Sequence, residues 1–249
     1  MTRISWSRRL SALLAISLIV AAVCVALGIW QIARLHQEQQ FNAAVRAGLT
    51  ESPLPLQDLV STDVHPEAMR YRRVTATGTY DGGAQVELYG RTLDGRPGSH
   101  LLTPLVTGDG LAIIVDRGWI PLDLDRSEET PPAGQVEIEG VLFASEGDPP
   151  GQVGDATERG DALVRVDLER IQAQLPYPIA PVYMLLQAPS TADPGELPVP
   201  APLPELSDGP HLSYALQWFT FATISLVGFV VVALREGRGS STAGADDLG

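Results

Sequence analysis

The sequence predicts a membrane protein in which two transmembrane helices flank an extracytoplasmic, mainly-β domain. The helices are predicted from two segments without a charged side chain, Leu10–Ala33 and Leu212–Leu234. Each exceeds the roughly 20 residues that a helix needs to cross a hydrocarbon core about 30 Å thick. The domain is predicted from alternating apolar and polar residues between the spans, which favour an antiparallel β barrel or sandwich with one short helix.

Charge sets the expected orientation of the two spans. Arginines precede the first span and follow the second: Arg3, Arg8, Arg9, Arg235 and Arg238. The positive-inside rule then places both termini in the cytoplasm of a multi-pass protein of the cell (plasma) membrane. A cleavable secretory signal is the alternative for the first span. Its apolar run is longer than the usual h-region of about 7–15 residues, and no small-x-small cleavage site follows before Arg34.

These features divide the chain into six parts. We expect a cytoplasmic N-terminus (1–9), a transmembrane helix (10–33), an extracytoplasmic β-rich domain (34–188), a proline-rich linker (189–211), a second transmembrane helix (212–234) and a disordered cytoplasmic tail (235–249). The linker is predicted because Pro189–Pro210 contains seven prolines in 22 residues, a density that excludes a sheet interior.

Composition excludes several classes of function. Between Leu35 and Pro210 there are 27 acidic residues and 11 arginines, a net charge of −16. Such a surface argues against nucleic acid and against docking onto anionic lipid, so lipid contact is expected only at the spans. Cys24 is the only cysteine, so the chain can form neither an internal disulfide nor a thiolate metal site. We expect an inert thiol that faces lipid or packs between helices.

The strands of the domain are predicted from a period of two, clearest in Arg72–Tyr80 and Gln135–Leu142. Further strands are predicted at Gln85–Arg91, His100–Val106, Leu111–Asp116, Ala162–Val166 and Val182–Gln187. Only one helix is predicted inside the domain, Leu168–Leu175, with Asp167 as its N-cap and Pro176 after its end. A short helix over Leu35–Gly48 is predicted to continue the first span.

Catalytic signatures are missing from the sequence. It contains no G-x-S-x-G elbow, phosphate loop, CxxC motif or histidine pair at metal-ligand spacing. We therefore expect that the protein is not an enzyme. His100, which opens a predicted strand, is interpreted as structural.

The outer ends of the two spans are the most informative part of the chain. Their polar and aromatic residues are Trp30, Gln31 and Arg34 on the first span and His211, Tyr214 and Trp218 on the second. Helical spacing puts the second group on one face, and the topology puts both groups at one depth. One interpretation is an interfacial belt of anchoring and snorkelling side chains. The other is that His211 ligates a haem iron while Arg34 pairs with a propionate.

Four sequence blocks follow one another along the chain: Gly28–Arg34; Tyr71–Val74 with Gly78 and Tyr80; Arg91, Gly95–His100 and Thr103–Leu105 followed by Ile114–Pro121; and His211–Phe219. In these blocks and their order the chain resembles the Surfeit locus protein 1 family of cytochrome oxidase assembly factors. Because the blocks cover nearly the whole chain and are bracketed by two spans, the resemblance extends to the architecture.

The resemblance implies a function and a site. It implies help in building the core subunit of haem–copper cytochrome c oxidase, with haem a as a transient ligand and the enzyme that makes haem a as a further partner. The iron ligand proposed for the family matches His211, and its Trp-Gln-x-x-Arg block matches Trp30, Gln31 and Arg34. Tyr214 and Trp218 complete the predicted cofactor site.

The sequence departs from the family pattern at two positions. Glu38 stands where the family often has a basic residue, which weakens a propionate clamp, and Asp116 stands where Asn is usual. Arg117, Gly118 and Trp119 follow Asp116 and are predicted to be structural or interaction residues, with Gly118 in a backbone conformation that only glycine tolerates.

A second hypothesis belongs to another class of function. In it, the chain is a membrane-tethered extracytoplasmic interaction domain that docks a partner on its acidic surface and binds no cofactor. Visible absorption of the purified protein would distinguish the two hypotheses.

Overall fold

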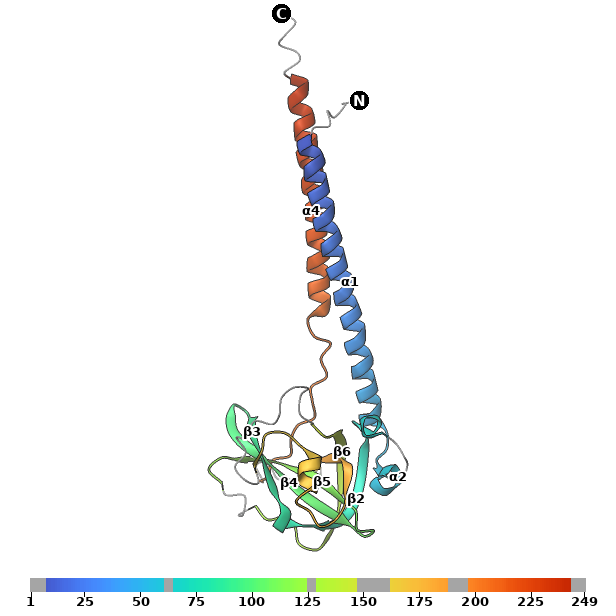
Figure 1. The fold of residues 1–249 in the computed structure, drawn as a ribbon, viewed down its shortest axis with the longest axis vertical. Coiled ribbons are helices and arrows are strands. Elements are labelled where there is room, and N and C mark those ends of the chain that lie inside the picture. Colours follow the sequence, from blue (N-terminus) through green and yellow to red (C-terminus); the bar gives the residue numbers. More distant parts are fainter. Residues whose placement is uncertain (1–7, 61–64, 125–128, 147–161, 188–196, 243–249) are drawn as a thin grey trace, which may run out of the picture. The chain divides into compact units, whose positions relative to one another are not determined.

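The structure is a computed structural model that describes residues 8–60, 65–124, 129–146, 162–187 and 197–242 (Figure 1). It divides into two compact units. The first contains the residues up to Ala43 and those from Glu205 onward, and the second contains Ala44–Pro204. Each unit is described by itself.

Two long helices make up the first unit. Helix α1 covers Arg8–Thr50 and helix α4 covers His211–Thr242. Both are long and apolar enough to cross a membrane, judged by length and composition. Helix α1 includes both the predicted first span and the predicted short helix Leu35–Gly48, and it ends before Pro53.

Helix α4 is longer than the predicted second span. It includes 235–242, which begin the segment predicted to be a disordered tail, so that prediction is wrong for these residues. A helix that is already formed adds residues at little cost, which explains the extension into a polar segment. The remaining residues of the predicted tail, 243–249, lie outside the described residues.

The two helices pack through small side chains. The small buried residues of this interface recur every three or four positions on α1 and at separations of seven and eleven on α4: Ser17, Ala21, Cys24 and Gly28 on α1, and Ala215, Ala222 and Ala233 on α4. This spacing puts them on one face of each helix. Small residues let helix backbones approach closely. Helices commonly associate in this way in a lipid environment, where the hydrophobic effect does not drive them together. Cys24 packs against Ala21 and Ala222 between the helices.

A polar contact fixes the register of this apolar interface. The Ser17 hydroxyl lies 2.7 Å from the carbonyl oxygen of Ser225 and 3.0 Å from its hydroxyl oxygen. The Ser225 hydroxyl in turn donates to the Ser17 carbonyl at 3.2 Å. Each hydroxyl therefore has a partner on the facing helix, and a shift of one helix along the other would break these bonds.

The second unit contains a closed five-stranded barrel. Its strands, in order around the barrel, are β2 (Arg73–Tyr80), β6 (Gln135–Ala144), β8 (Ile179–Leu186), β5 (Ala112–Pro121) and β4 (Arg96–Thr107). The ring closes because β4 also pairs with β2, where Gly78 faces Thr107. Strands β5 and β8 are parallel, whereas the other neighbours in the ring are antiparallel.

Shorter elements extend the sheet outside the ring. β3 (Val86–Leu93) pairs with β4, and β7 (Ala162–Leu163) pairs with β3. β1 (Leu54–Pro55) pairs with β2 and leads into a five-residue helix, α2 (Leu56–Val60). Two 3₁₀ turns are formed by Pro66–Met69 and Gly82–Ala84. Helix α3 (Leu168–Gln172) begins at Asp167, whose carboxylate accepts from Arg170 N–H.

Two apolar clusters lie on opposite sides of the barrel wall. Ile113 and Val115 of β5 point into the barrel, where they join residues of every strand in the ring. Ile114 points outward and packs with Leu168 and Ile171 of α3. Strand β5 is therefore covered on both faces, which explains why its sequence is continuously apolar rather than alternating.

The structure confirms the barrel, one of the two predicted alternatives, and corrects two other parts of the predicted fold. The sheet is mixed rather than purely antiparallel because β5 and β8 run parallel. The prediction of a single helix inside the domain is wrong, since α2 is a second one. Leu56 of α2 is buried in the barrel cluster and Leu59 packs against it, a pattern too short to be recognised in sequence.

Candidate functional site

His211 is the first residue of α4 and is held by α1. Its Nδ1 lies 2.9 Å from Oε1 of Gln31. An amide oxygen has no hydrogen to donate, so the histidine nitrogen must be the donor in this bond. The neutral ring then carries its proton on Nδ1, and Nε2 has a free lone pair. The structure thus brings together Gln31 and His211, which the sequence placed at one depth.

The segment just before His211 is also attached to α1. Asp208 accepts hydrogen bonds from Asn42 Nδ2 at 3.0 Å and from Gln39 Nε2 at 3.3 Å. Gly209 follows with a φ of +66°, and a Cβ at this position would lie 3.3 Å from Nε2 of His211. Neither Asp208 nor Asn42 was predicted as a site residue, because only the structure shows that Asp208 lies against α1.

The three predicted aromatic residues differ in their surroundings. Trp30 and Tyr214 are 55% and 48% exposed and so present apolar rings to their environment. Trp218 is instead partly buried against the cluster of Ala21, Cys24 and Ala222, and it meets the Phe221 ring edge-on at 5.9 Å. Trp218 therefore serves helix packing in this structure, whereas Trp30 and Tyr214 are free to contact a ligand.

Arg34 is paired with side chains of its own helix. Its guanidinium lies 3.0 Å from Oε1 of Glu38 and 3.1 Å from Oε1 of Gln37, both on its own helix. This ion pair is exposed, and such pairs contribute only about 0–1 kcal/mol. An anionic ligand could therefore compete for Arg34, and its pairing with a propionate stays a prediction.

The predicted site residues fit a haem better than a bare metal ion. The described residues contain no group of three or more His, Cys, Asp or Glu that could hold a metal ion. A haem needs from the protein only an axial ligand, apolar contact for the macrocycle and cations for the propionates. His211 Nε2, the exposed rings of Trp30 and Tyr214, and Arg34 supply these three kinds of group.

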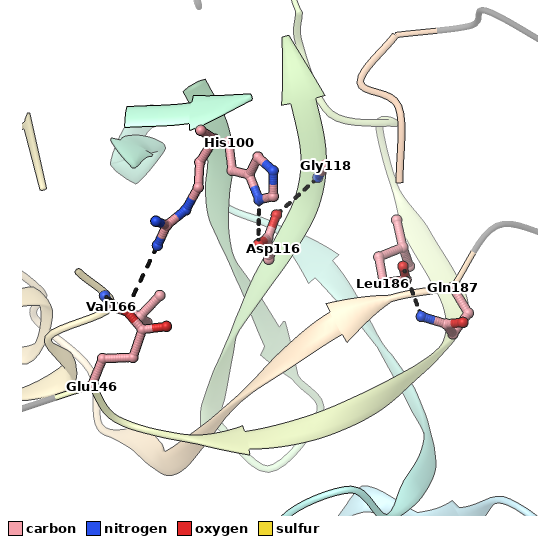
Figure 2. A network of polar contacts seen from close by, with 8 residues as sticks. His100, Asp116, Gly118, Glu146, Val166, Leu186 and Gln187 are labelled. Atoms are coloured by element: carbon pink, nitrogen blue, oxygen red, sulfur yellow. Dashed lines mark hydrogen bonds and ion pairs between the residues drawn. The ribbon is translucent and has the colours of Figure 1, made fainter. Parts of the chain in front are cut away.

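Asp116 organises a second group of residues in the barrel. Figure 2 shows its carboxylate between His100 and Gly118. One oxygen lies 2.8 Å from His100 Nδ1, and the other accepts the Gly118 N–H at 3.0 Å. His100 is thus a structural partner of Asp116, which agrees with its interpretation from the sequence. The isolated carboxylate in an apolar strand was the only sequence signal of this pair.

Gly118 occupies a conformation that other residues rarely adopt. Its φ is +123°, and a Cβ there would overlap the carbonyl oxygen of Val199. Trp119 on the same strand exchanges two backbone hydrogen bonds with Val199, at 2.7 and 2.9 Å. The segment that contains Val199 was predicted to be a proline-rich linker. Gly118 permits this segment to approach strand β5 closely, and the backbone bonds of Val199 attach it to the barrel.

Arg117 is a buried cation. Only 6% exposed, it donates to Gln85 Oε1 at 2.8 Å and to the Glu129 carbonyl oxygen at 3.1 Å, and its guanidinium lies 5.8 Å from the centre of the Tyr80 ring. Burial lowers the pKa of Arg117, while Tyr80 and Glu129 oppose that change. Arg117, Gly118 and Trp119 are therefore packing residues of the barrel.

Comparisons to known proteins identify the family of this chain. A family model described as "SURF1 family" matches residues 18–223, which is most of the chain. The chain belongs to the SURF1 family. An uncharacterized SURF1-like protein of Mycobacterium tuberculosis is 27% identical over 235 residues, covering 90% of this chain and 84% of that protein. A SURF1-like protein of Rickettsia felis is 26% identical and covers 88% and 95% of the two chains.

A third SURF1-family comparison carries a functional name. The cytochrome oxidase assembly protein SHY1 of Saccharomyces cerevisiae is 34% identical over 95 residues, which is 38% of this chain and 24% of that protein. This similarity is local, whereas the bacterial SURF1-like proteins match along most of their length.

Proposed function

We propose that this chain is a membrane-anchored assembly factor for haem–copper cytochrome c oxidase, which holds haem a transiently at His211 during delivery to the oxidase core subunit. Membership of the SURF1 family and the similarity to SHY1 support the role in assembly. The observation that carries the haem proposal is the bond from His211 Nδ1 to Gln31, because it leaves Nε2 available as a ligand.

Each predicted site residue has a distinct role in this proposal. His211 would supply a nitrogen ligand to the iron, and Trp30 and Tyr214 would give the macrocycle apolar contact through their exposed rings. Arg34 would pair with a propionate in place of Glu38. The haem itself supplies the iron and the redox-active ring, and the protein holds and orients it without catalysing a reaction.

The two apolar helices support a location for this function. We propose that α1 and α4 cross the plasma membrane with both termini in the cytoplasm, following the arginine bias. His211 then lies at the outer membrane surface, where α4 begins. The barrel domain meets the oxidase core subunit outside the cytoplasm, and the enzyme that makes haem a is the proposed donor.

A second function is favoured by charge. The segment between Leu35 and Pro210 has a net charge of −16, which suits docking to a basic partner surface. In that case the chain is a tethered docking domain that binds no cofactor. The two functions differ in whether His211 is needed for the haem content of the oxidase.

Complementation tests the proposed function. Cells that lack this protein receive the wild type, His211→Ala or His36→Ala, and the haem a and activity of the oxidase in their membranes are measured. His36 is an exposed histidine on α1 and serves as the matched control. We expect His211→Ala to accumulate normally but to lower oxidase haem a, while His36→Ala behaves as wild type. Full complementation by His211→Ala would favour the docking domain.

A further inference from the structure

We infer that Gln31 is a positioning residue that fixes the tautomer of His211 and so presents Nε2, rather than Nδ1, to the iron. This inference rests on the proposed function, since it takes His211 as the haem ligand. In this role Gln31 determines which nitrogen of His211 binds the iron and how strongly that nitrogen donates.

The hydrogen bond between the two residues determines the proton's position. Oxygen Oε1 of Gln31 can only accept, and it lies 2.9 Å from Nδ1 of His211. A neutral imidazole has one N–H, so this contact places the hydrogen on Nδ1 and the lone pair on Nε2. Metal-ligating histidines commonly donate their second ring N–H to an oxygen acceptor in this way.

The chain that carries His211 is attached to the helix that carries the acceptor. Gln31 and Asn42 are eleven residues apart on α1 and so lie on nearly the same helix face. Asn42 is buried and donates to Asp208, three residues before His211. The backbone before His211 and the ring itself are thus both attached to one face of α1, which restrains rotation of the imidazole.

Gly209 lies beside the other ring nitrogen. It has a φ of +66°, and the Cβ of a larger residue would lie 3.3 Å from both Nε2 and Cδ2 of His211. A side chain at this position would therefore crowd Nε2, which glycine avoids. The bond to Gln31 occupies Nδ1, so Nε2 is the ring nitrogen left to act as a ligand.

Two substitutions change the acceptor in opposite directions. Gln31→Leu removes it, so the tautomer is no longer fixed and the imidazole becomes a weaker donor. Loss of such an outer partner typically lowers metal affinity 10–100-fold. Gln31→Glu replaces the amide oxygen by a carboxylate, which keeps the Nδ1–H tautomer and makes the imidazole a stronger donor. Gln40→Leu is the matched control, because exposed Gln40 lies nine residues from Gln31 on the opposite face of α1.

The first measurement uses the haem-free, full-length protein in detergent. Nitrogen-15 NMR of labelled histidine at about pH 8 reports which ring nitrogen carries the proton, and the signals missing from His211→Ala identify residue 211. We expect wild type, Gln40→Leu and Gln31→Glu to carry the proton on Nδ1, and Gln31→Leu to lose this preference. A proton on Nε2 in the wild type would overturn the inference.

The second measurement is titration with haem a, followed by visible absorption and redox potentiometry. We expect Gln31→Leu to bind about 10–100-fold more weakly and at a higher reduction potential, Gln31→Glu to bind at a lower potential, and Gln40→Leu to match the wild type. Unchanged affinity and potential in both Gln31 variants would overturn the inference. If Gln31→Leu does not accumulate, the potential of Gln31→Glu decides alone.

The same titration distinguishes failure of the inference from failure of the proposed function. Loss of haem in His211→Ala together with wild-type binding in both Gln31 variants would leave His211 as the ligand and remove Gln31 from the site. Wild-type binding by His211→Ala would instead show that His211 is not the ligand, whatever the Gln31 variants do.

Discussion

At Gly118 both the backbone conformation and the surrounding atoms exclude a side chain. It combines a φ of +123° with a backbone oxygen, that of Val199, where a Cβ would lie. We expect Gly118→Val to lower the free energy of unfolding by more than about 1–3 kcal/mol and to reduce the folded yield. Denaturant unfolding and protease resistance of the full-length protein measure this effect.

The control for this substitution is Gly108→Val. Gly108 has no positive φ, and a Cβ there meets no atom within 4 Å. Its substitution should leave stability nearly unchanged. Wild-type stability of Gly118→Val would show that the contact between strand β5 and the segment containing Val199 does not restrict the barrel.

Three buried or partly buried tyrosines make the barrel sensitive to alkaline pH. Burial raises the pKa of Tyr80 to about 12 despite the opposing charge of Arg117, and it also raises the pKa of Tyr177 and Tyr183. Tyr177 additionally donates to Asp81 at 2.7 Å. Unfolded tyrosines ionise near pH 10, so the unfolded state loses these protons first.

Stability should therefore be fully present below about pH 10 and should fall as the pH rises through about 12. Absorbance of tyrosinate and circular dichroism, recorded against pH, test this expectation. We expect three of the six tyrosines to ionise together with loss of the barrel signal. Ionisation of all six near pH 10 with an intact barrel would contradict the description of these side chains.

At the scale of elements, α1 and α4 pack through small residues, and the one cysteine offers a direct test. Cys24 and Ala222 belong to one packed cluster. We expect Ala222→Cys to form a disulfide with Cys24 under mild oxidation, so that the two helices stay joined after protease cleavage between them. Gly228→Cys is the control, because a Cβ at Gly228 meets no atom within 4 Å.

Equal cross-linking of the two variants, or none in Ala222→Cys, would contradict the observed pairing. Cleaved protein run on a non-reducing gel separates these outcomes, and reduction of the sample confirms that a disulfide is responsible. The test does not depend on haem, so it examines the helix pair independently of the proposed function.

The elements that sequence could predict are those with one buried face. Strands β2 and β6 alternate and were located within a residue or two. Strand β5 extends to Pro121 and β8 begins at Ile179, beyond the predicted limits. Both strands are buried on two faces, so alternation does not mark their ends. Their parallel pairing joins distant segments and leaves no local sequence pattern.

The candidate site was predictable in position but not in its contacts. Helical spacing and topology placed Gln31 opposite His211, and the structure brings them into contact. The direction of Arg34 toward Glu38 depends on rotamers, and the anchoring of Asp208 by Asn42 depends on the path of the preceding loop. Residue type and spacing determine neither the rotamer of Arg34 nor the path of the loop that carries Asp208.

At the scale of the whole molecule, the proposal requires both ends of the chain in the cytoplasm. A reporter enzyme that works only in the cytoplasm should be active when fused after residue 238 and silent when fused after residue 147, which lies outside the described residues. The physical reason is the excess of arginine at both ends. Activity of the fusion after residue 147 would contradict the two-span arrangement.

The most direct test of haem binding is the visible absorption of the full-length protein, purified in detergent from cells that make haem a. We expect the wild type and His36→Ala to carry haem, and His211→Ala to be as abundant and as well folded but to have lost or shifted that absorption. Added imidazole should restore part of the spectrum by filling the ligand position. As much haem in His211→Ala as in the wild type, with an unshifted spectrum, would contradict the account.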